Sequence, residues 1–207
     1  MSPLGNFPSM DFEIAWGLEP GPERTAALVA WFQGLFEDPS KAPVLVGGGA
    51  VELYTSGAYV TGDLDFVGYV TESVAEKLRE AGFQRIGRHW KHEEAQLFIE
   101  VPGTFLESGA EATELNAFGR IVRVISPEDA LVDRLAGWKF WKSGDYGVNA
   151  YRLYRAQAPH LETERLEQRA RLEHVQDTLE ELVRFVADTE GRYPSEKELR
   201  EWARRDR

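Results

Sequence analysis

Two aspartates one residue apart, Asp63 and Asp65, are the residues of this 207-residue chain best suited to metal chemistry. They lie in the segment 63–67 (DLDFV), which we predict to be a β-strand. Because side chains alternate across a strand, both carboxylates point to the same face. Aspartate is poorly suited to strands, and like charges on one face repel each other. The pair therefore indicates a bound cation, expected to be Mg²⁺ or Mn²⁺, since such ions take carboxylate and phosphate oxygens.

Three consecutive glycines, Gly47, Gly48 and Gly49, precede this pair. They follow a short apolar run, residues 44–46, that suits a buried strand, and glycine permits close approach of another group to the backbone. Residues 50–54 then predict one or two helical turns. Free backbone N–H groups at a helix start form an anion site. Phosphate and metal would thus meet at one place.

This combination resembles a known signature. The glycines 47–49, followed after a short helix by residues 61–65 (TGDLD), are similar to the motif of the nucleotidyltransferase superfamily built on the DNA polymerase beta fold. Among its members, the small bacterial AbiEii-like toxins and related nucleotidyltransferase-like proteins are the most similar. The resemblance covers residues 44–100 and, more loosely, residues 126–154. It implies a Mg²⁺-dependent enzyme that uses a nucleoside triphosphate such as ATP.

The resemblance also implies roles for particular residues. Asp63 and Asp65 would hold the metal, and a third carboxylate would arrive from a nearby strand. Glu100, inside the predicted strand 95–101, is the acid available for that role and for deprotonating an acceptor hydroxyl. The alternative for Glu100 is an edge-strand residue that faces water.

The expected nucleotide-binding residues are the three glycines, a threonine of the motif and three cations of a later helix. These residues are Gly47, Gly48, Gly49, Thr61, Arg134, Lys139 and Lys142. Arg134 stands where related proteins often have lysine. Cations in the last turn of a helix also interact favourably with its dipole, which is the competing explanation for the two lysines.

Two positions depart from the superfamily pattern. Gly49 and Tyr59 stand where related proteins usually have serine and often have arginine, so a hydroxyl and a cation are missing near the phosphates. Two alternatives to an active transferase follow. The first is a catalytically degenerate fold that acts as a binding or regulatory module. The second is the toxin half of a toxin–antitoxin pair that modifies RNA, which the acidic composition disfavours.

Other interpretations of the glycine segment are weaker. Gly47, Gly49 and Asp65 match part of a dinucleotide-binding fingerprint, but Glu52 occupies the third glycine position and would repel a pyrophosphate. A P-loop is excluded because no Gly-Lys-Ser/Thr follows. The remaining alternative is a glycine turn with two solvated aspartates.

Composition limits the class of protein. The hydrophobic content of 43% indicates an ordered globular chain, and the net charge of −11 argues against broad non-specific binding to nucleic acid. A local basic patch could still bind an RNA end. The chain has no cysteine and shows no leader or membrane-length apolar run, so we expect no membrane association and a cytoplasmic location. A protein partner or a homodimer is compatible with the sequence.

The elements that must position these residues form an α/β (α+β) fold, with a mixed sheet flanked by helices. We expect residues 1–125 to comprise an N-terminal arm (1–21), a helix (22–36) and the nucleotidyltransferase-like core, including strands at 83–90, 95–101 and 118–125. Residues 126–207 would form a helical C-terminal region that packs on this core. Its expected helices span residues 126–141, 148–158, 161–187 and 196–205, the first starting at Ser126-Pro127.

Overall fold

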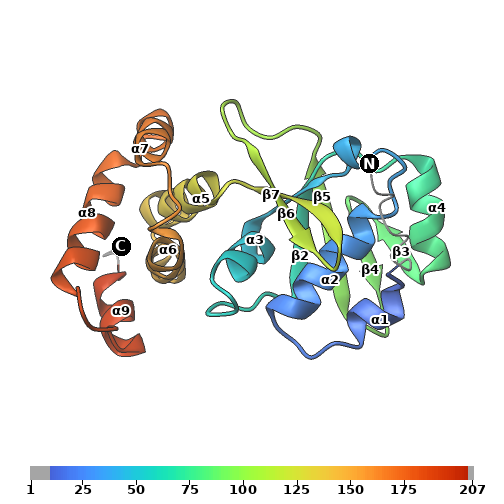
Figure 1. Cartoon of the computed structure of the whole chain (residues 1–207), viewed down its shortest axis with the longest axis horizontal. Coiled ribbons are helices and arrows are strands. Elements are labelled where there is room, and N and C mark those ends of the chain that lie inside the picture. Colours follow the sequence, from blue (N-terminus) through green and yellow to red (C-terminus); the bar gives the residue numbers. More distant parts are fainter. Residues whose placement is uncertain (1–9, 205–207) are drawn as a thin grey trace, which may run out of the picture.

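The computed structural model describes residues 10–204, with a mixed β-sheet at one end of the molecule and a group of helices at the other (Figure 1). The strands are β1 (Val44–Val46), β2 (Asp63–Val67), β3 (Phe83–Ile86), β4 (His89–His92), β5 (Leu97–Gly103), β6 (Ala112–Ala117) and β7 (Arg120–Ile125). The helices that accompany the sheet are α1 (Phe12–Trp16), α2 (Pro22–Gln33), α3 (Gly47–Tyr54) and α4 (Glu72–Glu80). The helices that follow it are α5 (Pro127–Phe140), α6 (Gly144–Gln157), α7 (Thr163–Leu172), α8 (Gln176–Asp188) and α9 (Glu196–Trp202).

The strands form one seven-stranded sheet in the order β3-β4-β5-β2-β1-β7-β6. β2 is antiparallel to β1 and parallel to β5, and β1 is parallel to β7. The predicted mixed α/β fold is therefore confirmed. β5 lies inside the sheet, between β4 and β2, so the interpretation of Glu100 as an edge-strand residue is wrong.

The two faces of the sheet differ in polarity. One face carries buried apolar side chains such as Leu45, Phe66 and Ile99, and α2 packs on it through Phe32, whose ring centroid lies 4.5 Å from that of Phe66. The alternate residues of the same strands point to the opposite face. That face carries the carboxylates of β2 and β5, because each strand has a side-chain period of two.

Local features differ from the sequence prediction where a turn has no strong marker. The predicted strand 83–90 is a hairpin, β3 and β4, with Gly87 at a φ of +63° in its turn. The predicted helix 161–187 is two helices, because His174 adopts a φ of +57° between α7 and α8. Strand β6 was not predicted. Within the predicted N-terminal arm, residues 10–21 include helix α1, and residues 1–9 lie outside the described part of the chain.

Other local predictions are confirmed. Ser126 caps α5, its hydroxyl accepting the backbone N–H of Asp129 at 3.1 Å, with Pro127 at the first helical position. Ser195 and Glu198 form the reciprocal capping box of α9. The prediction for α4 is wrong in its cap: the sequence favoured a capping box of Ser73 and Glu76, whereas Thr71 caps the helix by accepting the backbone N–H of Val74.

A buried ionic cluster fixes α7 to the sheet end of the molecule. Asp129, on α5, accepts hydrogen bonds from Arg169 Nε at 2.6 Å and from Arg165. Arg169 also donates to the carbonyl oxygen of Ser108 at 3.1 Å, and Arg165 pairs with Glu111 at 3.0 Å, so both arginines hold the loop between β5 and β6. Within residues 10–204, no helix combines the length and apolarity needed to span a bilayer.

Candidate functional site

The predicted carboxylates meet on one face of the sheet. Asp65 on β2 pairs in register with Glu100 on β5, and Glu100 pairs with His89 on β4. Asp63 lies two residues before Asp65 and therefore shares its face. The sequence and the family resemblance predicted that these three acids share one site. The parallel pairing of β2 with β5 places Glu100 beside Asp65.

The ionised form of Asp65 is electrostatically unfavourable in this fold. Its partial burial raises its pKa, and the nearby carboxylates of Glu100 and Asp63 raise it further, while Arg134 acts in the opposite direction. A Cβ atom on Gly47, whose φ is +61°, would overlap the Asp65 carboxylate. Gly47 is therefore required both by the backbone conformation and by the space that Asp65 fills.

The three glycines form the first turn of α3, whereas the sequence predicted a turn before the helix. Their environments differ. Gly47 lies beside Asp65, and Gly49 faces the core. Gly48 lies close to the side chains of Thr61 and Tyr59. A Cβ atom at Gly49 would lie 3.1 Å from Leu45 Cδ1, so a serine there would point toward the core.

The loop that carries Thr61 is anchored from inside the protein. Glu52 is completely buried on α3, and its Oε2 accepts the backbone N–H of Thr61 at 3.0 Å. Its other carboxylate oxygen is buried with no hydrogen-bond partner in the described part of the chain. Glu52 therefore positions the start of β2 and does not face a phosphate site. The dinucleotide interpretation is also wrong, because β1 and β2 are antiparallel where that motif requires parallel strands.

Arg134 reaches the site from α5. Its guanidinium pairs with Asp133 and lies over the ring of Tyr146, 4.4 Å from the ring centroid. Tyr146 packs so closely on Gly137 that a Cβ atom at that position would overlap its ring. Arg134 is thus a buried cation that lines the same cleft as Asp65 and lowers the pKa of that carboxyl.

The two predicted lysines lie elsewhere. Lys139 Nζ donates to Asp177 Oδ1 at 2.6 Å and to the carbonyl oxygen of His174 at 2.7 Å, which ties α5 to α8. Lys142 is exposed after the end of α5. Neither residue lines the cleft described below, so their assignment to nucleotide binding stays a prediction.

Glu100 is engaged by basic residues of the β3–β4 hairpin. Arg88 Nε lies 2.7 Å from Glu100 Oε1, and His89 Nδ1 lies 3.5 Å from Oε2. Among residues 10–204, no group of three or more His, Cys, Asp or Glu side chains is arranged to hold a metal. The predicted three-carboxylate ligand set therefore stays a prediction, with Asp63 and Asp65 as its nearest pair in sequence.

A cleft of about 690 Å³ opens over these residues, a volume typical of small-molecule sites. Asp65 and Glu100 line it from the sheet, Gly47 from the start of α3, and Arg134 from α5. Three exposed aromatic side chains also line it. They are Phe105 on the β5–β6 loop and Phe140 and Trp141 at the end of α5, with 88%, 56% and 68% of their surface exposed.

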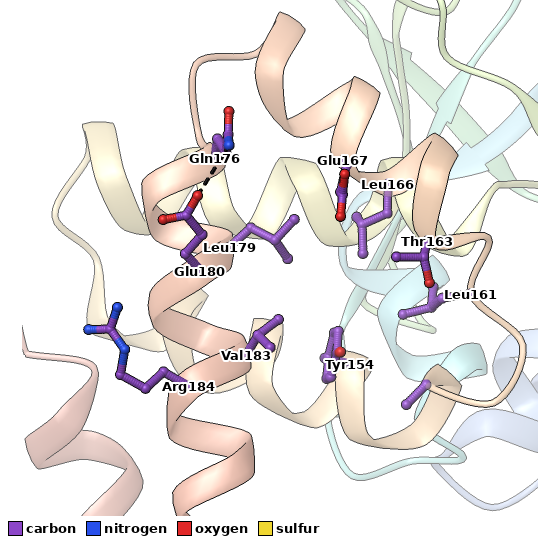
Figure 2. Close-up of a pocket in the computed structure, with 11 residues that line it drawn as sticks. Tyr154, Leu161, Thr163, Leu166, Glu167, Gln176, Leu179, Glu180, Val183 and Arg184 are labelled. Carbon is purple, nitrogen blue, oxygen red and sulfur yellow. Dashed lines mark hydrogen bonds between the residues drawn. The ribbon is translucent and has the colours of Figure 1, made fainter.

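A second cavity of about 460 Å³ lies between α6, α7 and α8 (Figure 2). Tyr154, Leu166, Leu179 and Val183 give it an apolar lining, and Figure 2 shows Glu180 at its rim with its carboxylate bonded to Gln176. No cluster of acids or cations converges within it in the described part of the chain. The larger cleft is therefore the candidate functional site.

Sequence reasoning missed several residues of that cleft. Arg88 was hidden because the segment 83–90 was predicted to be one strand, although Gly87 between two apolar segments could have indicated a hairpin. Trp141 and Phe140 follow the apolar face of α5 in sequence, so they were indistinguishable from core residues. Phe105 lies in a loop without a motif.

The fold defined by this sheet and its helices is nucleotidyltransferase-like. The structure is similar to the crystal structure of an antigenic nucleotidyltransferase-like protein from Paracoccidioides brasiliensis, with a TM-score of 0.50 and 16% sequence identity. The similarity covers 80% of this chain and 95% of that protein. No model of a known protein family matches the sequence, and no curated protein matches it. At this level of identity the similarity shows the fold alone.

Proposed function

We propose that this protein is a metal-dependent nucleotidyltransferase, which transfers a nucleoside monophosphate from a nucleoside triphosphate to an acceptor hydroxyl. The observation that carries the proposal is the placement of Asp63, Asp65 and Glu100 on one face of the sheet, where Asp65 and Glu100 line a cleft beside the start of α3. Carboxylates that repel one another in this way are stabilised by a cation.

The residues present fit a divalent metal. Asp63 and Asp65 offer hard oxygen atoms, and such ions are commonly held by one or two carboxylates together with substrate phosphates. Burial is the main cause that raises the pKa of Asp65, and the carboxylates of Glu100 and Asp63 raise it further; a bound cation would stabilise the ionised form of this group. When bound, Mg²⁺ would supply charge neutralisation for the phosphates and orient the leaving group.

The chain's own residues suggest how the reaction would proceed. The acceptor oxygen attacks the α-phosphorus, the bond from that phosphorus to the oxygen bridging to the β-phosphate breaks, and pyrophosphate leaves. Glu100 would take the proton of the acceptor hydroxyl. The backbone N–H groups of the first turn of α3 and the guanidinium of Arg134 would bind the triphosphate. The exposed rings of Phe105 and Trp141 suit stacking on a nucleobase.

A binding or regulatory module with the same fold is the second candidate. It is favoured by the contacts of Arg88 and His89 to Glu100 and by Tyr59 at the position of the usual arginine. The AbiEii-like toxin hypothesis, which an adjacent antitoxin-like gene would support, stays a prediction. The cytoplasmic location and a protein partner or homodimer stay predictions as well.

Calorimetric titration tests the proposal. Each nucleoside triphosphate is titrated into the protein with Mg²⁺ or with chelator, and the Asp63→Asn/Asp65→Asn double variant is compared with Asp188→Asn, which removes an exposed carboxylate on α8. We expect Mg²⁺-dependent binding that the double variant loses and Asp188→Asn retains. Transfer of a labelled nucleoside monophosphate should follow the same pattern. Binding that survives in the double variant would overturn the metal site, and binding without transfer to any acceptor would favour the binding module.

A further inference from the structure

Arg88 holds an unusual position among the cations of the cleft. It is the second residue of the two-residue turn between β3 and β4, after Gly87. Its carbonyl oxygen accepts the backbone N–H of Val101 at 3.3 Å, which fixes the turn against β5 beside Glu100. The backbone of Arg88 is therefore held in place, while 64% of its side chain is exposed.

Three arginines line the cleft in the described part of the chain, and their partners differ. Arg134 pairs with Asp133, and Arg169 pairs with the buried Asp129. Arg88 pairs with Glu100, which is the expected third metal ligand. A metal that recruits Glu100 would thus compete directly with Arg88, whereas the other two arginines would keep their partners.

The release of Arg88 has a small cost. The side chain of Arg88 is largely exposed, and an ion pair with an exposed partner contributes little to stability. Arginine stays charged at any physiological pH, so it cannot leave as a neutral group. Once released, it remains on the wall of the cleft and needs a new anionic partner. The phosphates of a triphosphate are suitable because a guanidinium binds phosphate oxygens in a bidentate manner.

We propose that Arg88 exchanges partners during substrate binding: it holds Glu100 while the metal is absent, and it binds the polyphosphate of a nucleoside triphosphate when Glu100 becomes a metal ligand. This inference rests on the proposed function. It identifies a substrate-binding residue, and it supplies a cation for the phosphates although Tyr59 occupies the position where related proteins often have arginine.

Arg88→Gln tests the exchange, with Arg85→Gln as the matched control. Arg85 lies on the same hairpin, is exposed and donates to the carbonyl oxygen of Gly87 at 3.1 Å, but it does not line the cleft. The first measurement is the affinity for Mn²⁺ in the absence of nucleotide, monitored by electron paramagnetic resonance. The second is the ratio of the affinities for ATP and AMP at saturating Mg²⁺, which isolates the contribution of the β- and γ-phosphates.

We expect Arg88→Gln to bind Mn²⁺ roughly threefold more tightly than the wild type, because Glu100 loses its arginine partner, and to lower the ATP-to-AMP ratio roughly tenfold. Arg85→Gln should match the wild type in both measurements. If Arg88→Gln changes neither quantity or only one of them, the exchange is wrong. In that case, metal-dependent ATP binding that the Asp63→Asn/Asp65→Asn variant loses would leave the proposed function intact. Failure of every variant and of the wild type to bind metal or nucleotide would overturn the proposed function and this inference together.

Discussion

The carboxylate of Asp65 packs against Gly47 so closely that the Cβ atom of any other residue at position 47 would overlap it. The two residues belong to the consecutive elements α3 and β2. The first turn of the helix thus sets the position of the acid that we assign to metal binding. This contact gives the first prediction.

Gly47→Ala should lower the free energy of unfolding by about 1–3 kcal/mol, because alanine is strained at a φ of +61° and its Cβ would displace Asp65. It should also abolish metal-dependent nucleotide binding. Denaturant unfolding and calorimetry measure the two effects. Gly62→Ala is the control, since a Cβ there meets no atom within 4 Å. Unchanged stability and binding in Gly47→Ala would contradict the assigned role of this contact.

Asp65→Asn should stabilise the protein at neutral pH. The folded state raises the pKa of Asp65 through burial and through Glu100 and Asp63, so its ionised form is unfavourable in the fold. This penalty is fully present above the raised folded-state pKa and disappears below the unfolded-state value, because the folded state binds the extra proton in between. The wild type should therefore gain stability relative to Asp65→Asn as the pH falls.

The expected gain at pH 7 is up to about 1 kcal/mol, the scale of like-charge pairs between strands. Thermal unfolding at a series of pH values measures it, with Asp188→Asn as a control that should show no such trend. If Asp65→Asn proves less stable than the wild type at pH 7, the electrostatic description of the site is wrong.

Asp129→Asn should destabilise the protein by about 3 kcal/mol, because it removes the buried charged partner of Arg169 and leaves that guanidinium with only the partly exposed Glu173 as a charged partner. Glu72→Gln breaks the exposed pair with Arg79 and should cost at most about 1 kcal/mol. Denaturant unfolding of both variants provides the comparison. Equal effects would show that the buried cluster does not contribute more than a surface ion pair.

The same cluster predicts acid sensitivity. Burial acts to raise the pKa of Asp129, but hydrogen bonds from the backbone of Glu111 and from Ser126 and Arg169 outweigh it and hold the pKa below its usual value. The stabilisation is therefore present above the unfolded-state pKa and is lost as the pH falls through the lower folded-state pKa. Asp129→Asn should remove this part of the acid dependence of unfolding.

Trp141→Ala should weaken nucleotide binding while leaving tripolyphosphate binding unchanged, because stacking on a base contributes about 1–3 kcal/mol and phosphates make no use of it. Calorimetry with ATP and with tripolyphosphate separates the two. Tyr193→Ala, which removes an exposed aromatic residue that does not line the cleft, is the control. Equal weakening for both ligands would place Trp141 outside the base site.

The sequence predicted those parts of the fold and site that local rules determine. Alternation within the strand placed Asp63 and Asp65 on one face, and the Ser126-Pro127 start of α5 was readable from its capping chemistry. Glu100 was predicted from the resemblance, and its contact with Asp65 depends on the pairing of β2 with β5. That pairing joins segments more than thirty residues apart, and no local pattern shows it.

The remaining features depend on tertiary contacts. The break at His174 has no glycine or proline to mark it, and Lys139 is taken up by Asp177 of a helix that the sequence joined to α7. From the sequence, the charge of Glu52 was expected to repel a phosphate. In the structure Glu52 is buried, and its carboxylate accepts the backbone N–H of Thr61. These features depend on which helices and strands pack against one another, and local sequence patterns do not show that packing.

The register between β2 and β5 also constrains how this protein can change during evolution. Inserting or deleting one residue within β5 would turn Glu100 into the apolar core and bring Ile99 out to the cleft, since the side-chain period is two. Such a change would damage folding and chemistry at once. The strand that carries Glu100 should therefore keep its length even in a descendant that no longer needs catalysis.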